Sequence, residues 1–210
     1  MSESTSRWLA DLPRLAGELA GAARELHARG WMQGTSGNAS VVVDSTPVRL
    51  AITPSGVDKG RLTADDLVVI DDTGRVILGT RRPSEEAPLH LALVLTAKAG
   101  AVVHTHSVWG TILSGLGAEH EGLRLEGYEM LKGLSGVRTH EHAEWLPILG
   151  NTQDFEALAV KVTAVLARHP ASHGVLLSRH GLYTWGRDLA EAKRHTEILE
   201  FLLEVTGRMR

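Results

Sequence analysis

Cysteine is absent from this chain of 210 residues, which excludes disulfide bonds and thiolate metal ligands. A transition-metal site would therefore have to use histidine, aspartate, glutamate or water. Apolar runs long enough to span a membrane are also lacking, and the polar segment 1–7 has no apolar core of a signal peptide. We therefore expect a cytoplasmic protein with no membrane partner.

An excess of charge of one sign is lacking as well. The chain has 22 lysines and arginines against 25 aspartates and glutamates, scattered along its length, with a formal net charge of −3. No basic surface is indicated, so we expect no nucleic-acid partner. The sequence contains no linker, repeat or low-complexity tract, and its length and hydrophobic share of 43% fit a single domain over residues 1–210.

Helix and strand patterns follow one another irregularly along the chain. Near the N-terminus apolar residues recur at helical spacing, with Pro13 placing the start of the helix near Asp11 and Gly30 its end. Further helices are expected over residues 85–99, 109–116, 154–169 and 189–205, and strands over 39–43, 49–52, 67–70, 76–78, 101–106, 174–177 and 182–185. This order predicts an α/β fold with a mixed, largely antiparallel sheet and helices on both faces.

Two histidines separated by one residue, His104 and His106, follow the apolar run 101–103. Residues i and i+2 of a strand project from the same face, so this pair can hold one ion. His180 follows another apolar run, 174–177. A third imidazole from a neighbouring strand would leave a fourth position open for water or substrate, as in catalytic zinc sites. The pattern therefore predicts a metal-dependent enzyme.

The same spacing also arises without a metal, because the chain carries 11 histidines. His140 and His142 form a second pair, but they lie in the polar stretch 138–144, where solvated side chains are expected. The first pair ends an apolar strand, where buried imidazoles need partners. That context favours the first pair as the metal site.

Three segments could receive an anion. Residues 33–40 and 53–56 contain glycine and hydroxyl side chains, and residues 83–85 lie at a probable helix start. Glycines let backbone N–H groups converge on a phosphate without obstruction by side chains. The third loop precedes a predicted helix, whose N-terminus offers further free N–H groups. Each loop alone also fits an ordinary turn or helix cap.

Two glutamates are candidates for acid–base chemistry. Glu86 begins a predicted helix shortly before the histidine pair, and Glu129 lies between glycines and beside apolar residues. A carboxyl group in such a partly apolar setting would have a raised pKa and could act as an acid. The alternative for both is a solvated surface side chain.

Together these segments resemble the class II aldolase/adducin family. The similarity spans most of the chain and rests on motifs in a fixed order: Gly-Thr-Ser-Gly-Asn (34–38), Thr-Pro-Ser-Gly (53–56), Pro-Ser-Glu-Glu (83–86), His-Thr-His (104–106) and Arg-His-Gly (179–181). The resemblance implies a three-layer α/β/α fold, a sugar-phosphate substrate and one divalent ion per subunit, usually Zn²⁺. It places the metal on His104, His106 and His180. It also implies a homo-oligomer, in many members a tetramer with active sites near subunit interfaces.

The resemblance also assigns the phosphate-binding positions. They fall on Asn38, Ser55, Gly56 and Ser84. Gly37 in the same glycine-rich loop and Glu86 are further substrate-binding candidates. Fuculose-phosphate aldolases usually carry Ser-Ser-Glu at the third loop, where this chain has Ser84-Glu85-Glu86. One hydroxyl is thus lost, whereas a glutamate that can line the pocket or approach the metal is kept.

Residues 128–133 (Tyr-Glu-Met-Leu-Lys-Gly) and 179–186 are similar to a branch of the family that acts in methionine salvage. The resemblance implies Zn²⁺-dependent dehydration of 5-methylthioribulose 1-phosphate to 5-methylthio-2,3-dioxopentyl phosphate. Glu129 falls on the acid/base position and would protonate the departing hydroxyl, while Glu129 itself or Glu86 would remove the C3 proton. An aldolase or epimerase would use the same metal site, and a metal-free, adducin-like interaction module is a further alternative.

Overall fold

The computed structural model describes residues 3–210, with side chains from Arg7 onward. Its strands are β1 (Asn38–Ser45), β2 (Val48–Ile52), β3 (Val68–Asp71), β4 (Val76–Leu78), β5 (Ala101–Thr105), β6 (Gly122–Glu126), β7 (Ala143–Leu149), β8 (Gly174–Leu177) and β9 (Gly181–Gly186). They form one nine-stranded sheet in the order β4-β3-β2-β1-β5-β9-β8-β7-β6. Neighbouring strands are antiparallel except β7 and β8, which are parallel. The predicted mixed, mainly antiparallel sheet is confirmed.

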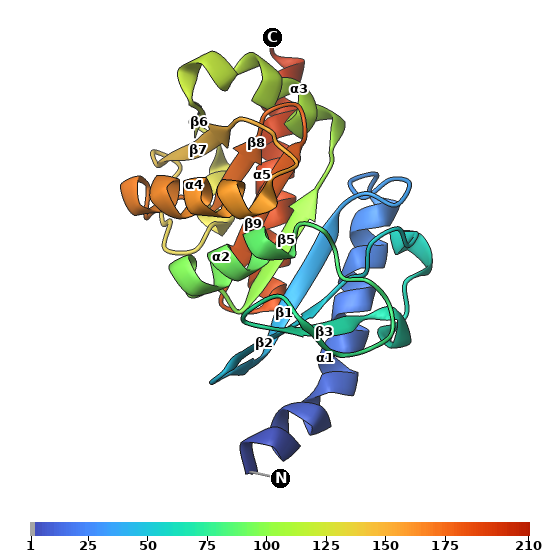
Figure 1. The fold of residues 1–210 in the computed structure, drawn as a ribbon. Helices are drawn as coiled ribbons and strands as arrows, with labels where there is room; N and C mark the ends of the chain where they lie inside the picture. The colour runs from blue at the N-terminus through green and yellow to red at the C-terminus, as the bar shows by residue number, and fades with distance from the viewer. Residues whose placement is uncertain (1–2) are drawn as a thin grey trace.

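Helices cover both faces of this sheet (Figure 1). They are α1 (Glu3–Ala28), α2 (Ala87–Ala97), α3 (Val108–Leu116), α4 (Phe155–Arg168) and α5 (Leu189–Arg208), with short 3₁₀ turns η1 (Lys59–Arg61), η2 (Ala64–Asp66), η3 (Ala118–His120) and η4 (Glu129–Gly133). Helices α2 and α4 pack together on one face, and α1 and α5 lie on the other. The result is the three-layer α/β/α arrangement that the resemblance implies.

Strand alternation divides the core between the two faces. In β5, Val102 packs in the cluster beneath α2 and α4, whereas Ala101 and Val103 pack in the cluster beneath α1. Because side chains alternate with a period of two, His104 projects on the same face as Val102. Thr105 projects on the opposite face, with Val103. The end of β5 therefore presents different chemistry to the two layers.

The helix bounds differ most from the prediction at α1 and α2. Helix α1 begins at Glu3 and contains Pro13, so the predicted start near Asp11 is wrong. Trp8 is buried in the core cluster beneath α1, which keeps the turn before the proline packed in spite of the lost N–H donor. Helix α2 spans only Ala87–Ala97, because Lys98 adopts a left-handed conformation with φ of 52° and ends it.

Strands β6 and β7 were not predicted from the sequence. Pro147 lies inside β7 opposite Gly122 of β6, and proline normally argues against a strand. Part of the polar stretch 138–144 also packs inward. His140 is exposed as predicted, but His142 bonds Glu144, whose side chain is 1% exposed. The burial of Glu144 is a tertiary effect that local polarity does not reveal.

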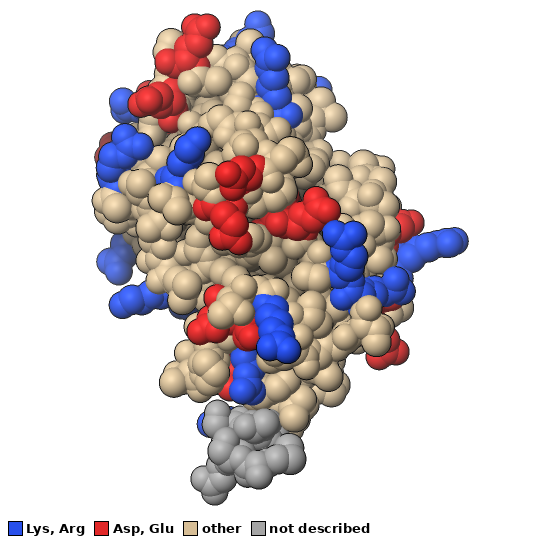
Figure 2. Space-filling view, in the orientation of Figure 1, with Lys and Arg blue, Asp and Glu red and all other residues tan. Residues whose placement is uncertain are grey.

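Two surface features bear on possible partners. Within residues 3–210, no helix combines the length and apolar character needed to cross a bilayer. On the face shown in Figure 2, lysine and arginine side chains are interspersed with aspartate and glutamate. No extended basic surface covers this face.

Candidate metal centre and adjoining cleft

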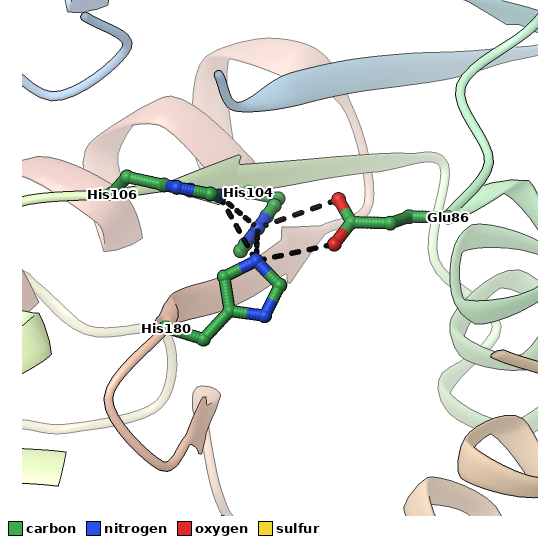
Figure 3. A group of neighbouring side chains, drawn as sticks. All are labelled: Glu86, His104, His106 and His180. Carbon is green, nitrogen blue, oxygen red and sulfur yellow. Dashed lines mark hydrogen bonds and ion pairs between the residues drawn. The ribbon is translucent and has the colours of Figure 1, made fainter. Parts of the chain in front are cut away.

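The structure brings the three predicted metal histidines together (Figure 3). His104 and His106 lie at the end of β5, and His180 lies in the turn between β8 and β9. Since β5 pairs with β9, this turn comes to lie beside the histidine pair. The Nε2 atoms of His104 and His106 are 2.7 Å apart, and His180 Nε2 lies 3.2 Å and 3.1 Å from them.

Hydrogen bonds on the far side of two rings determine which nitrogens converge. His104 Nδ1 donates to the carbonyl oxygen of Leu182 at 3.0 Å, and His180 Nδ1 donates to Asn151 Oδ1 at 3.1 Å. Both acceptors are oxygens, so Nδ1 carries the proton and Nε2 presents a lone pair. Lone pairs that face each other at these distances repel unless a cation lies between them. This donor arrangement therefore fits a metal ion.

The surroundings of the cluster keep its imidazoles neutral, as metal ligation requires. Burial, followed by the neighbouring imidazoles, lowers the pKa of His106 to about 3. Burial also lowers the pKa of His104 well below its usual range and depresses the pKa of His180. The site can thus bind a cation without first releasing protons at neutral pH.

Glu86 completes the cluster from the N-terminal end of α2. Its Oε2 lies 3.4 Å from His104 Nε2, and its Oε1 lies 3.3 Å from His180 Nε2. The four side chains are the one group of three or more possible metal ligands found among the side chains that the structure describes. They are compatible with a divalent metal ion. Glu86 therefore approaches the predicted metal position, one of the two roles expected from its sequence motif.

A buried hydrogen-bond chain orients Glu86. Asn38 Nδ2 donates to Glu86 Oε2 at 2.5 Å, and Asn38 Oδ1 accepts from His90 Nε2 at 2.5 Å. His90 Nδ1 in turn accepts from the Ser40 hydroxyl at 2.7 Å. Burial lowers the pKa of His90 to about 4, so this imidazole stays neutral and retains both bonds. Asn38, predicted to hold phosphate, thus has both ends of its amide engaged inside the protein.

A cleft of about 240 Å³ opens beside the histidines. Its lining includes His106 and His180 and every predicted substrate-binding residue: Gly37, Asn38, Ser55, Gly56, Ser84 and Glu86. The second and third loops are joined by a β-bridge between Pro54 and Pro83 and by the bond from Ser55 N to the Arg82 carbonyl oxygen. Loops distant in the sequence therefore meet at the metal cluster.

Glycine is required at one point of this lining. Gly37 has φ of +68°, and a Cβ there would lie 2.7 Å from Met32 Cγ and 2.9 Å from the carbonyl oxygen of His104. A larger residue would push the first loop away from the strand that carries the histidines. This close approach explains the second glycine of the Gly-Thr-Ser-Gly-Asn motif.

Lys59 also lines the cleft and was not predicted from the sequence. Its side chain is buried, and Nζ donates to the carbonyl oxygens of Thr35 and Val57 at 2.9 Å each. The one indication in the sequence was that a lysine lies three residues after Gly56, the last residue of the second candidate anion-binding loop. A lysine at such a position is solvated in most chains, so its burial was not expected.

Glu129 lies apart from the cleft lining. It begins η4 with its side chain 72% exposed, and Lys132 Nζ lies 2.6 Å from its Oε1. The hydrogen bond and charge of Lys132 lower the pKa of Glu129. The partly apolar setting and raised pKa predicted for Glu129 are therefore wrong for the isolated subunit, because the carboxylate is solvated and paired. Its catalytic role stays a prediction.

A larger hollow of about 960 Å³ lies next to Ala99 and Gly186, at the end of strands β5 and β9 opposite the histidines. Its histidines have protein partners. His173, for example, bonds Glu144 through Nδ1 at 3.0 Å and the Ser135 carbonyl oxygen through Nε2 at 2.8 Å. Because the convergent, unpaired nitrogens lie in the smaller cleft, we assign the chemistry there rather than to the larger hollow.

Comparison with known proteins agrees with this geometry. The family model described as Class II Aldolase and Adducin N-terminal domain matches residues 17–206. A methylthioribulose-1-phosphate dehydratase from Marinobacter nauticus is 46% identical over 87% of this chain and 88% of its own length. Another, from Sorangium cellulosum, is 43% identical over 93% of this chain and 92% of its own length.

Solved structures give the same assignment. An L-fuculose 1-phosphate aldolase superposes with a TM-score of 0.78 at 26% identity, covering 93% of this chain and 86% of the aldolase. YgbL from Klebsiella pneumoniae superposes with a TM-score of 0.79 at 27% identity, covering 94% of this chain and 90% of its own. The family model, the curated relatives and the solved structures all point to one family. The chain belongs to the class II aldolase and adducin family.

Proposed function

We propose that this chain is a hydro-lyase that dehydrates 5-methylthioribulose 1-phosphate to 5-methylthio-2,3-dioxopentyl phosphate, a cytoplasmic step of methionine salvage. Relatives named methylthioribulose-1-phosphate dehydratase, 43–46% identical over most of this chain, support the substrate. The observation that carries the chemistry is the convergence of three histidine Nε2 atoms and Glu86 at a cleft bordered by glycine-rich loops.

We propose Zn²⁺ as the ion, one per subunit, held by His104, His106 and His180. Three neutral imidazoles with an open position are the usual donors of a catalytic zinc site. When bound, such an ion supplies the charge that polarises a substrate carbonyl and acidifies the neighbouring C–H bond. Glu86, held by Asn38 at the cleft, is then the carboxylate placed to accept the C3 proton.

The balance of the reaction requires a second proton step. Once the C3 proton has left, the C4 hydroxyl departs with a proton as water, and the enol tautomerises to the diketone. We propose Glu129 as the group that protonates this hydroxyl. Because Glu129 does not line the cleft of its own subunit, it would act in the cleft of a neighbouring copy in a homo-oligomer.

An exposed apolar stripe supports such an oligomer. Val108, Ile112 and Leu116 lie one helical turn apart along α3 and are 69%, 43% and 58% exposed. This helix begins two residues after His106, so a subunit that covers the stripe lies near the metal cluster. Contiguous exposed apolar surface commonly marks a protein interface. A tetramer, as in many members of the family, is the proposed assembly.

Turnover of zinc-loaded protein tests the proposal directly. Dehydration of 5-methylthioribulose 1-phosphate would be followed by appearance of the diketone, beside cleavage of fuculose 1-phosphate as a control. Diketone formation without cleavage is the expected result. Inactivity of metal-loaded protein toward the dehydratase substrate would overturn the proposal.

A sugar-phosphate aldolase is the second candidate. It is favoured by the structural similarity to an L-fuculose 1-phosphate aldolase and by the position of Glu86 within 3.4 Å of His104 Nε2. Cleavage of the control sugar without dehydration would select this alternative. A stable protein that binds no metal would instead favour an adducin-like interaction module.

A further inference from the structure

We propose that Lys59 is the cationic group that binds the phosphate of the substrate, and that it also joins the two glycine-rich loops around that phosphate. The inference rests on the proposed function for the identity of the sugar, but not for the anion site itself. It begins from the position of Nζ, which donates to the carbonyl oxygen of Thr35 in one loop and of Val57 in the other, both at 2.9 Å.

The bonding of this ammonium group is incomplete. A lysine has three N–H donors, and Lys59 uses two of them on neutral carbonyl oxygens. Its side chain is only 1% exposed, so water contributes little to its solvation. The nearby carboxylates of Asp58 and Glu86 favour its charged form, but among the described residues neither forms an ion pair with Nζ. A phosphate at the cleft would supply a directly bonded partner of opposite charge.

The cleft needs this positive charge. Its lining includes the carboxylates of Glu85 and Glu86. Two carboxylates beside a phosphate dianion repel it. Lys59 is the one lysine or arginine among the described residues that line the cleft. A metal at the histidines and Lys59 beside the loops would therefore together balance the acidic lining.

The predicted phosphate ligand Asn38 does not remove this need. Its amide already donates to Glu86 and accepts from His90. Ser55, Gly56 and Ser84 remain to hydrogen-bond the phosphate, but they carry no charge. Charge-assisted bonds to phosphate are about twice as strong as neutral ones, so Lys59 would contribute a large share of the affinity.

Binding of inorganic phosphate to the metal-loaded protein tests the proposal by calorimetry. Lys59→Met keeps the length of the side chain and removes the charge, and it should weaken binding about 10- to 100-fold. Lys59→Arg keeps the charge and should bind more tightly than Lys59→Met. Lys161→Met is the matched control, because Lys161 is exposed on α4, and its affinity should be unchanged. Equal affinity of Lys59→Met and the unaltered protein would overturn the proposal.

Two further measurements keep the test decisive if Lys59→Met unfolds. A crystal of the unaltered protein grown with phosphate should place a phosphate oxygen within about 3.2 Å of Lys59 Nζ, the limit of an N–H···O bond. A phosphate bound elsewhere would contradict the proposal. Phosphate binding that depends on Lys59, in a protein that does not dehydrate the sugar, would refute only the proposed function. Dehydration with an unchanged KM in folded Lys59→Met would refute only the role of Lys59.

Discussion

The Thr105 hydroxyl donates a hydrogen bond of 2.5 Å to Oε1 of Glu200, on the face of β5 opposite the metal histidines. Glu200 is 3% exposed, and its Oε2 has no hydrogen-bond partner among the described residues. Burial, only partly offset by the hydroxyl groups of Ser107 and Thr105, raises the pKa of Glu200 to about 7. A buried carboxyl thus holds Thr105, the residue directly before His106.

This raised pKa predicts a dependence of stability on pH. Below about pH 4.5 Glu200 is protonated in both the folded and the unfolded chain, so its ionisation does not change the free energy of unfolding. Between about 4.5 and 7 only the unfolded chain releases the proton, and the free energy of unfolding falls by up to about 3 kcal/mol.

Glu200→Gln should therefore become more stable relative to the unaltered protein as pH rises from 5 to about 7. Denaturant unfolding at several pH values measures this difference. Glu204→Gln, which removes an exposed carboxylate paired with Arg208, is the control and should show no such trend. A constant difference between Glu200→Gln and the unaltered protein across this range would contradict the prediction.

Removal of one metal ligand should release the ion. In His106→Ala, two imidazoles and Glu86 remain, and we expect metal affinity to fall by more than the ~10- to 100-fold that loss of a supporting residue causes. Metal content after dialysis and thermal melting with added Zn²⁺ measure the effect. His140→Ala, from the exposed second pair, should keep the full metal content.

Glu129→Gln should keep the metal and lose turnover, by about 10²- to 10⁴-fold if Glu129 supplies the proton to the departing hydroxyl. The substitution should leave the subunit folded, because the Glu129 side chain is exposed and its contact with Lys132 lies at the surface. Product formation and bound metal would be measured on the same preparation. Retained dehydration would remove Glu129 from the mechanism.

Mixed oligomers distinguish the subunit in which Glu129 acts. If Glu129 serves a neighbouring cleft, mixing inactive Glu129→Gln with inactive His106→Ala subunits should restore part of the activity. Each mixed interface would then combine an intact metal cluster with an intact Glu129. If both residues serve the same subunit, every mixture stays inactive.

Gly181→Ala should destabilise the sheet at the metal cluster. A Cβ at Gly181 would overlap the carbonyl oxygen of Thr105 on the adjacent strand and lie 3.1 Å from His104 Cε1. We expect a loss of about 1–3 kcal/mol in the free energy of unfolding, with weaker metal binding. Gly17→Ala is the matched control, since a Cβ there meets nothing within 4 Å, and in a helix it should stabilise by about 0.5–1 kcal/mol. Denaturant titration compares the two variants.

Features that depend on local chain geometry could be predicted from the sequence. Strand alternation places His104 and His106 on one face whatever surrounds them, and glycine at residue 37 indicates a backbone that other residues avoid. The order of short motifs indicated the family, and the irregular alternation of elements indicated a mixed sheet. Strand β7 was missed because Pro147 is a local signal against a strand, which its pairing with β6 overrides.

The remaining features depend on which distant residues the fold brings together. The bonds that hold Glu86 join residues 48 and 52 positions apart, and the bond from Thr105 to Glu200 spans 95. Burial likewise decides the charge state of His106 and the solvation of Lys59, because desolvation depends on the whole packed environment. The sequence by itself therefore determined which side chains can ligate a metal. Only the tertiary structure decided how those side chains are oriented and where Glu129 and Lys59 lie, since hydrogen bonding and desolvation act between segments far apart in the chain.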